Sequence, residues 1–434
     1  MIRVRRHLTA AGILYLFLLL VPPSGASQAQ NESPIIQLNV NKILIPVVVR
    51  DKNGRIVSDL KLEDFQVFDN DKPHSISGIA VETHEPTQPT APGAQLPDRQ
   101  SKPAPPGSPA SPQRFIVLLF DDLHLSNENM VQAKTAATQV LSETLAGHDI
   151  GAVISLSQKI NSGLTRDRKR LQDSIASLQP HAIYKADETQ CPNIDYYQAD
   201  LIENKHDAPA FQDAVRKVFN CEPGLDPRYN RNVAENEASS TSRRILALGH
   251  QDMQTTYASI AAFVRSMAQL PGERIMILVS PGFLRVEQDA LTAESKLMNL
   301  AAEADVTISA LDARGLYTTA IAASEKSPAL GGSSLQQNSE YRASSSTQAE
   351  DPLAELADGT GGTFFHNSND LGAGLKSLAQ TPETVYVLEL SSNQNDTEGS
   401  YHRLKVKVAR EGMQIQARRG YYFPAQSKSK KRNQ

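Results

Sequence analysis

An uninterrupted apolar run, Phe115–Phe120, is the feature that most constrains the fold of this chain. A strand with apolar side chains on both faces must be covered on both faces, as in a parallel sheet packed between helices. The segments after it alternate between strand and helix patterns, and helices of ~10–15 residues between strands indicate βαβ units. We therefore predict a doubly wound, mainly parallel α/β sheet of the Rossmann type over 114–383. Its strands are expected at 115–120, 151–156, 274–279, 306–311 and 363–365, and its helices at 131–145, 168–178, 257–270, 290–303, 371–379 and from 352 onward.

The N-terminus has the pattern of a secretory signal peptide over residues 1–29. Three arginines lie within the first six residues, and an apolar run over 8–21 follows them. This run suits a signal peptide and is shorter than the ~20 residues of a spanning helix. Small residues place cleavage after Ala29, with cleavage after Ala26 or an uncleaved anchor as alternatives. We expect a periplasmic or secreted protein with no membrane span once the signal is removed.

Two stretches interrupt the alternation inside the α/β region. Residues 180–250 are polar with weak periodicity and are interpreted as an insertion, helical around 208–219. Residues 320–350 are rich in Ser, Ala and Gln, which predicts a mobile loop. Cys191 and Cys221 lie in the insertion, and an even pair in an exported chain predicts one disulfide. Two buried free thiols are the alternative.

The ends of the chain differ from its middle. Residues 30–85 contain short β-branched runs and an Asn-Gly turn, which predict the first part of a small all-β domain. Residues 86–113 are Pro-rich and predict a linker. Three alternating strands over 384–424 are expected to complete the β domain, because each has one polar face. The basic tail, 425–434, is predicted to be a solvated terminus.

Composition excludes several classes of function. Lys plus Arg number 44 and Asp plus Glu number 48, so the formal charge of −4 argues against a nucleic-acid binder that works by charge. Two cysteines cannot form a four-Cys zinc site. The chain has no Gly-x-Ser-x-Gly and no His-Glu-x-x-His motif, so no hydrolase signature is present.

One polar motif, Asp122-Leu-His124-Leu-Ser126, directly follows the first predicted strand of the parallel sheet. Oxygen ligands two residues apart at the end of a strand can converge on a hard cation such as Mg²⁺. The motif resembles the metal-ion-dependent adhesion site of von Willebrand factor A (VWA) domains, where the pattern is Asp-x-Ser-x-Ser.

Further segments resemble motifs of the bacterial VWFA-related domain family, and they follow one another along the chain in the order found in that family. This resemblance implies an exported, VWA-like α/β domain that binds a protein or another cell-envelope macromolecule, and it implies no enzyme chemistry. It also implies that a partner carboxylate completes the shell of any bound metal. The segments that carry the resemblance are Asp59–Phe65, Leu164–Arg168, Ile308–Gly315, Leu356–Thr363 and Ala417–Tyr422.

The metal ligands of the family can be transferred only in part. Asp122 and Ser126 match two ligands of the first loop, but imidazole is a poor ligand for Mg²⁺, so His124 departs from the pattern. A degenerate Mg²⁺ or Ca²⁺ site is one interpretation. The alternative is that Asp122 and Ser126 cap a helix that starts near Asn127.

The remaining ligands are also incomplete. VWA domains place a threonine before the next helix, for which Thr255 or Thr256 is available. They place an aspartate after a later strand, where this chain has Ser280-Pro-Gly. Asp121 is a candidate substitute ligand, although its odd spacing would direct it to the opposite face if the strand continued. We name Asp121, His124 and Ser280 as candidate binding residues.

Two other functions stay open at this point. A hydrolase or transferase would use Asp121, Asp122 and His124 as an acid–base cluster, because a histidine beside carboxylates can act as a general base. A structural envelope protein with a vestigial site is the third interpretation.

Overall fold

A computed structural model describes residues 42–83, 114–143, 149–183, 191–316, 332–380, 384–391 and 401–422. The predicted signal peptide, Pro-rich linker and basic tail lie outside these residues. No helix within the described ranges is both long and apolar enough to cross a membrane.

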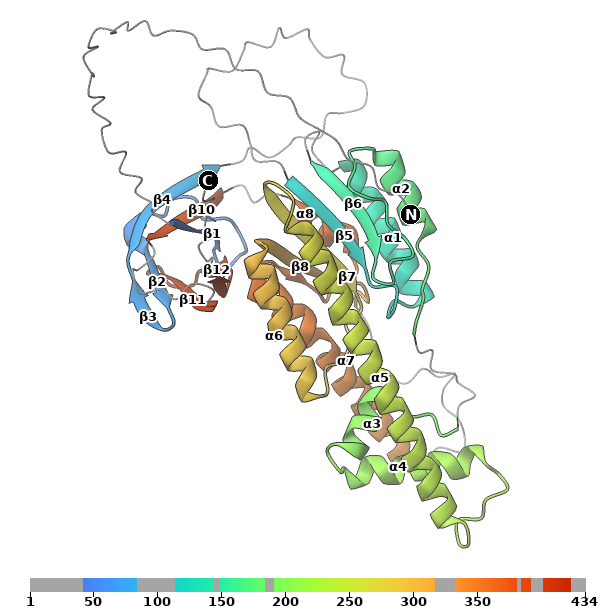
Figure 1. The fold of residues 1–434 in the computed structure, drawn as a ribbon. Coiled ribbons are helices and arrows are strands. Elements are labelled where there is room, and N and C mark those ends of the chain that lie inside the picture. Colours follow the sequence, from blue (N-terminus) through green and yellow to red (C-terminus); the bar gives the residue numbers. More distant parts are fainter. Residues whose placement is uncertain are drawn as a thin grey trace, which may run out of the picture. The chain divides into compact units, whose positions relative to one another are not determined.

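A five-stranded parallel sheet forms the centre of the α/β region (Figure 1). Its middle strands are apolar and buried on both faces, and every residue of β5 is buried. The predicted mainly parallel sheet is therefore confirmed. The strand order is β6 (Ile150–Ser155), β5 (Arg114–Phe120), β7 (Glu273–Ser280), β8 (Val306–Asp312) and β9 (Phe364–Phe365).

Helices cover both faces of this sheet. Alternate side chains of β5 pack in opposite directions: Ile116, Leu118 and Phe120 join one core, and Val117 and Leu119 join the other. This arrangement is doubly wound. The first core includes α1 (Asn127–Glu143), α2 (Arg168–Ser177) and α8 (Leu371–Ala379), and the second includes α5 (Arg231–Met267), α6 (Gln288–Glu303) and α7 (Gly332–Thr360).

The strand order creates a crevice at the carboxyl ends of the two central strands, β5 and β7. From β5 the chain passes to β6 on one side and later returns to β7 on the other side. Helices that leave in opposite directions open a gap beyond the carboxyl ends of the two central strands, where ligands bind in open α/β sheets. Residues 121–126 and Ser280 lie at these carboxyl ends.

Two four-stranded antiparallel sheets join the N-terminal and C-terminal segments of the chain. Strand β10 lies between β1 and β4, and β11 pairs with β2, so residues more than 300 positions apart are neighbours. The two sheets share one apolar core, in which Tyr386 is fully buried. Because residues 41–434 form one compact unit, a separately folding β domain stays a prediction. The sheets are β12 (Gln414–Ala417)–β1 (Lys42–Arg50)–β10 (Thr384–Ser391)–β4 (Ile76–Thr83) and β13 (Gly420–Tyr422)–β11 (Tyr401–Val408)–β2 (Phe65–Asp69)–β3 (Lys72–His74), with a short 3-10 turn at Leu62–Asp64.

The prediction of a mobile loop over 320–350 is wrong for residues 332–350, because these residues form the first part of α7. Tertiary contacts stabilise this helix despite its polar composition. The Phe283 backbone N–H donates to the Ala349 carbonyl at 3.1 Å, and the Arg314 guanidinium lies 2.7 Å from the Glu350 carboxylate. Leu353 is fully buried. Such contacts outweigh local propensity and are invisible in a single sequence.

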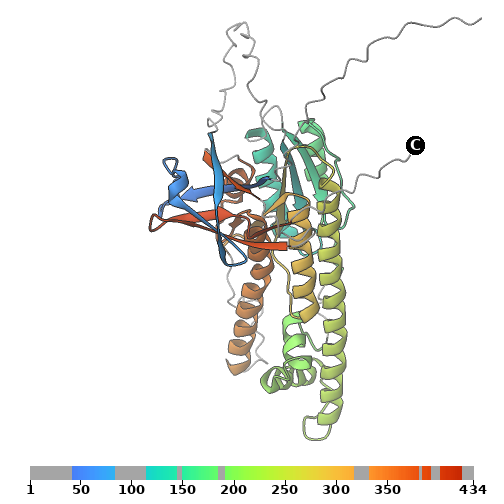
Figure 2. The same ribbon diagram turned by 60° about the vertical axis from the view of Figure 1, so that its left-hand side comes forward.

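The predicted insertion over 180–250 does not end at residue 250. Helix α5 runs without a break from Arg231 to Met267, so the predicted helix over 257–270 is only its last part. The first turns of α5 bury small residues such as Ala234, Ala238 and Ser242, which give a weak hydrophobic period. Helices α3 (Tyr196–Glu203) and α4 (Ala208–Cys221) pack beside these turns (Figures 1 and 2).

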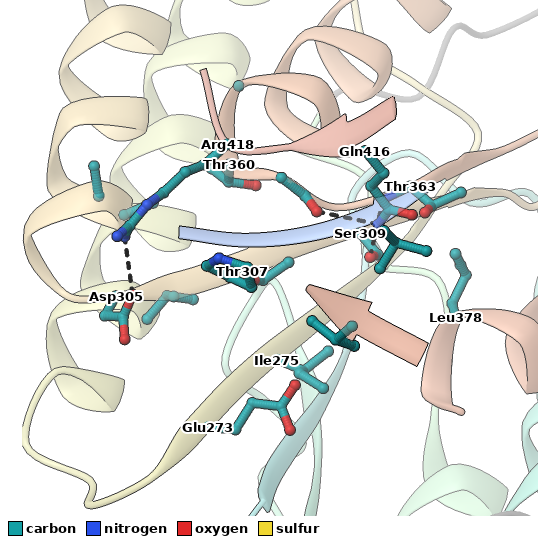
Figure 3. A pocket seen from close by; sticks show the side chains of 18 of the residues that line it. Glu273, Ile275, Asp305, Thr307, Ser309, Thr360, Thr363, Leu378, Gln416 and Arg418 are labelled. Atoms are coloured by element: carbon teal, nitrogen blue, oxygen red, sulfur yellow. Dashed lines mark hydrogen bonds and ion pairs between the residues drawn. The ribbon is translucent and has the colours of Figure 1, made fainter. Parts of the chain in front are cut away.

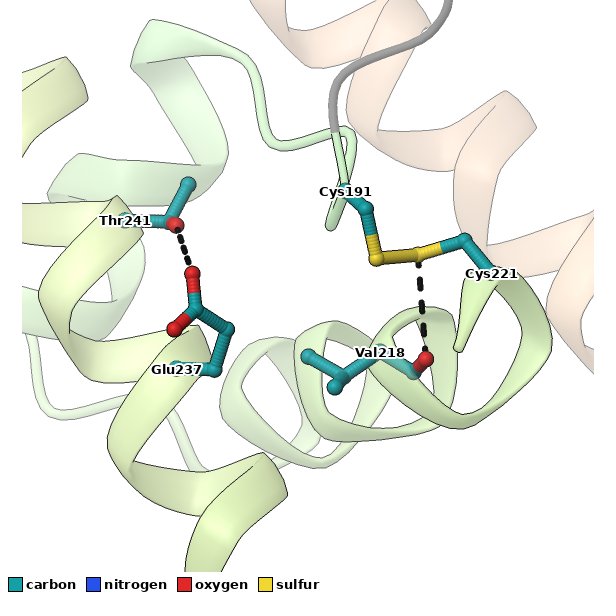
Figure 4. Close-up of a disulfide and its surroundings, with 5 residues drawn as sticks. All are labelled: Cys191, Val218, Cys221, Glu237 and Thr241. Carbon is teal, nitrogen blue, oxygen red and sulfur yellow. Dashed lines mark hydrogen bonds between the residues drawn. A yellow bond between two sulfur atoms is a disulfide. The ribbon is translucent and has the colours of Figure 1, made fainter. Parts of the chain in front are cut away.

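The predicted disulfide between Cys191 and Cys221 is confirmed. Its Cα atoms are 5.9 Å apart, and it joins the segment before α3 to the last residue of α4 (Figure 4). It closes a loop around a small helical core that contains Ile194 and Val218. The crosslink therefore fixes α3 and α4 to one another.

Candidate functional site

The carboxylate of Asp121 joins the ends of the two central strands. Asp121 is fully buried directly after β5. Its Oδ2 accepts a hydrogen bond from the Ser280 hydroxyl at the end of β7, at 2.6 Å. Its Oδ1 accepts from the backbone N–H of His124 at 3.2 Å and lies 2.8 Å from ring atom Nδ1. The structure thus brings together the three candidate binding residues Asp121, His124 and Ser280.

A second carboxylate holds the other side of the His124 ring. Atom Nε2 of His124 lies 2.6 Å from Oδ2 of Asp252, which is on α5. Since a carboxylate only accepts hydrogen bonds, both ring nitrogens carry protons when both bonds are formed. Burial by itself lowers the pKa of His124, but the charges of Asp121 and Asp252 raise the pKa to about 10. His124 is therefore an imidazolium cation at neutral pH.

Asp122 points toward a different group of residues. It is fully buried, and its Oδ1 accepts from the backbone N–H of Ser157 at 2.8 Å. Its Oδ2 accepts from the Ser157 hydroxyl and from Nδ1 of His181 at 3.0 Å. The His181 backbone N–H also donates to the Asp122 carbonyl at 2.6 Å. Consecutive aspartates therefore hold two different histidines.

Ser126 is an N-cap of α1. Its Oγ accepts from the backbone N–H of Asn129 at 3.1 Å and donates to Oδ1 of that residue at 2.8 Å. The capping alternative thus describes Ser126. It is wrong for Asp122, whose side chain bonds to Ser157 and His181.

Thr255 and Thr256 differ in their surroundings. Thr255 is half-buried, and its hydroxyl donates to the Gln251 carbonyl of its own helix at 2.8 Å. Thr256 is fully buried one turn after Asp252, and its hydroxyl has no hydrogen-bond partner among the described residues. No hydrogen bond joins Thr256 to Asp122 or Ser126 within the described part of the chain.

These residues do not fit the implied Mg²⁺ or Ca²⁺ site. Such ions need several oxygens directed at one point. The Asp122 and Ser126 oxygens are used in separate hydrogen-bond groups. The position between Asp121 and Asp252 already holds a cation, the imidazolium of His124.

A cleft of about 820 Å³ opens beside His124 and His181, between the sheet edge and the inserted helices. Apolar side chains form most of its walls, and none of the described residues that line it is Lys or Arg. Clefts with apolar walls and a few polar groups are the usual form of a binding site. The apolar residues include Leu123, Ile245, Met253, Phe283 and Leu284, and the polar ones include His124, His181, Asp195, Tyr196 and Asp252.

Sequence reasoning missed Asp252, His181 and Ser157. Asp252 lies between the stretch interpreted as an insertion, 180–250, and the helix predicted over 257–270, and no motif surrounds it. Its spacing of four residues from Thr256 places both on one face of a helix, which was the available signal. His181 and Ser157 follow a helix and a strand respectively, and only the folded sheet brings them to Asp122.

A smaller cavity of about 150 Å³ lies where the antiparallel strands meet β8 (Figure 3). The guanidinium of Arg418 lies 3.1 Å from Asp305, and the amide of Gln416 donates to the Gly361 carbonyl at 3.1 Å. Glu273 and Val306, at the amino ends of their strands, also line it. This cavity belongs to the packing of the sheets and is remote from the carboxyl ends that carry His124.

A separate cluster of His250, Glu287 and Asp289 has the ligand types of a metal site. Nδ1 of His250 is paired with Glu287, and Nε2 lies 3.4 Å from Asp289 and 2.7 Å from the amide of Gln254. Both ring nitrogens thus already have partners. This cluster includes none of the ligands expected from the sequence.

Comparisons with known proteins provide little beyond this geometry. No protein-family model and no curated protein matches the chain. Two solved structures match at 12% identity, each over 62% of this chain and 96% of its own: an aerotolerance-related membrane protein from Bacteroides fragilis (TM-score 0.31) and the conserved hypothetical protein BatB from Bacteroides thetaiotaomicron (TM-score 0.26). The N-terminal domain of TFIIH p34 matches with the same identity and coverages and a TM-score of 0.23. At these scores no residue role is transferred from them.

Proposed function

We propose that this chain is an exported, non-enzymatic protein that binds another protein or a cell-envelope macromolecule through the cleft beside His124, without a metal ion. The observation that carries the proposal is the bridge from Asp121 through the His124 ring to Asp252. The His124 ring there occupies the position between the two carboxylates that a metal ion would otherwise bind. The signal-peptide pattern and the ordered family motifs support export and a binding role.

The hydrolase or transferase alternative needs a histidine that accepts a proton near neutral pH. His124 has a carboxylate on each ring nitrogen, and its pKa is raised to about 10. It is a poor general base in this state. No observation favours the acid–base cluster over the binding role.

Thermal unfolding with and without metal tests the metal-free part of the proposal. A metal at ~100 Kd that binds only the native state would stabilise it by ~2.7 kcal/mol. We expect the same melting temperature for the mature protein in EDTA, Mg²⁺ and Ca²⁺. A rise with either ion that disappears in Asp122→Ala would overturn this part. Zn²⁺ is tested alongside His250→Gln, because a Zn²⁺ effect abolished by that variant belongs to the separate His250 cluster.

Partner capture from an envelope extract of the producing cells tests the cleft. Ala182 is exposed and lines the cleft, so Ala182→Arg obstructs it without disturbing the core. Val131 is 64% exposed on α1 and is absent from the lining, so Val131→Arg is the matched control. We expect a partner that is retained in EDTA and by the control, and lost with Ala182→Arg. Equal capture by both variants would contradict a role for the cleft.

A further inference from the structure

The polar side of the cleft has an excess of negative charge. Asp195 and Asp252 line the cleft, and the carboxylates of Asp121 and Asp122 are buried behind His124 and His181. The imidazolium of His124 is shared between Asp121 and Asp252. The side chain of Asp252 is 21% exposed and lines the cleft. The absence of Lys and Arg from the described lining leaves the excess uncompensated.

His181 offers a hydrogen-bond acceptor on the same side. Its Nδ1 donates to the buried Asp122 carboxylate, and its backbone N–H donates to the Asp122 carbonyl. These two bonds fix the ring and place a proton on Nδ1, so Nε2 is a hydrogen-bond acceptor in the neutral ring. Nε2 has no partner among the described residues, and the side chain is 25% exposed and lines the cleft.

Tyr196 forms part of the wall next to these acceptors. Its ring packs directly on Gly249, where an added Cβ would lie 2.3 Å from a ring carbon, so any larger residue would displace the ring. Its hydroxyl and Oδ1 of Asp252 are buried without a hydrogen-bond partner in the described chain. Unpartnered buried polar atoms are uncommon in folded proteins and mark places where a water or a ligand group belongs.

The charge around Tyr196 has the same sign as the charge around Asp252. Burial raises the pKa of the Tyr196 hydroxyl, and the carboxylates of Glu287, Asp200 and Asp289 raise it further, because a phenolate would add a negative charge to a negative region. The potential at this wall therefore favours a cation.

We propose that the cleft recognises a protonated amine or a guanidinium on an apolar stem, in the form of a Lys or Arg side chain of a protein partner. This inference rests on the proposed function and specifies the chemistry of its ligand. The apolar walls, with Leu123 and Phe283, cover the alkyl stem, and the carboxylate of Asp252 and Nε2 of His181 accept hydrogen bonds from the charged end.

This preference is opposite to the one implied by the family resemblance. A metal-dependent adhesion site binds a partner carboxylate through its cation. Here a partner carboxylate would meet the carboxylate of Asp252, and the neighbouring cation, His124, already has both ring nitrogens bonded to Asp121 and Asp252. The sign of the charge on the partner therefore distinguishes the two interpretations.

A positional-scanning peptide library tests the proposal on the intact mature protein. Each sublibrary fixes one residue type at its central position and randomises the positions around it. We expect the Lys and Arg sublibraries to be retained at least ten-fold more than those of Met or Leu. Asp252→Asn and His181→Gln should each reduce this enrichment at least ten-fold.

Two further variants make the result interpretable. Asp173→Asn removes one negative charge from a side chain on α2 that is 65% exposed and absent from the lining, and it should leave the enrichment unchanged. His181→Gln leaves the contacts of His124 intact, so its loss of binding cannot be attributed to disruption of that pair. Thermal unfolding of each variant confirms that it is folded.

Several results would overturn the inference. They are preferential retention of Asp or Glu, equal retention of aliphatic residues, a flat profile, or full enrichment in Asp252→Asn. If Ala182→Arg abolishes partner capture but the wild-type protein selects acidic or apolar peptides, the preference for a cation is rejected and the proposed function stands. A partner unaffected by Ala182→Arg would reject the proposed function itself.

Discussion

Asp121 and Asp122 are neighbours in the chain, and each holds a histidine, but the two histidines end in different situations. His124 is held at both ring nitrogens, by Asp121 and by Asp252. His181 is held at Nδ1 alone, and its second nitrogen faces the cleft without a partner among the described residues. The comparison teaches that an Asp–His pair is structural when both ring nitrogens have hydrogen-bond partners. The pair is available to a ligand when one ring nitrogen has none.

The largest expected effect separates the two histidines by stability. His124→Gln leaves two carboxylates near each other without their cation, and breaking such a pair costs about 3–5 kcal/mol. His181→Gln removes one hydrogen bond to Asp122, which costs about 1 kcal/mol. Urea unfolding at pH 7 measures both values. A control is His206→Asn, an exposed residue with a φ of 54°, a conformation that Asn tolerates well.

The pH dependence of stability tests the charge on His124. The pKa of His124 is about 10 in the folded protein and 6.5 for an unperturbed histidine, so its contribution to stability is complete below pH 6.5. It is lost progressively as the pH rises toward 10. The difference in unfolding free energy between wild type and His124→Gln should therefore shrink from pH 6 to pH 10. A difference that stays constant over this range would show that His124 is neutral in the folded protein.

The disulfide provides a perturbation that lies in the insertion. Replacing Cys191 and Cys221 by Ser should lower stability by about 2–4 kcal/mol, because the unfolded chain loses a constraint. Hydrogen exchange should rise in α3 and α4, whose core the crosslink closes. If the Asp121–His124 pair is independent of the insertion, the amides of residues 121–125 keep their protection. Faster exchange there would show that the two regions are coupled.

The smallest expected effect concerns Ser126, which the metal interpretation requires as a ligand. Ser126→Ala removes the N-cap of α1 and should cost about 1 kcal/mol at any metal concentration. The measurement is urea unfolding in EDTA and in Mg²⁺. A loss that is larger in Mg²⁺ than in EDTA would return Ser126 to the set of metal ligands.

Much of the fold was predictable because its signals are local. The continuous apolar run of β5 predicted a doubly covered strand, and alternating helices predicted the parallel sheet. Helix α8 was predicted to the residue, since a strong amphipathic period ends at a clear boundary. The first 20 of the 29 residues of α7 were missed, because contacts with distant segments stabilise that part of the helix. The first 26 of the 37 residues of α5 were missed, because small buried residues weaken their hydrophobic period.

The candidate site was predictable only where its residues are close in sequence. Asp121, Asp122 and His124 follow one strand, so their proximity was evident. The partners that decide what each aspartate does, Asp252 and His181, lie 128 and 59 residues away from the residues they bind. Their positions depend on how two helices and a loop pack against the sheet edge, which no local pattern encodes.

The continuity of α5 has a consequence for how this architecture can be altered. One unbroken helix carries both the first turns that pack on α3 and α4 and, about 32 Å along its axis, the carboxylate of Asp252. The inserted helices are therefore not a detachable module. Deleting them would remove the start of the helix that supplies Asp252, one of the two carboxylates bonded to His124. Any shortened version of this protein would therefore need a redesigned cleft.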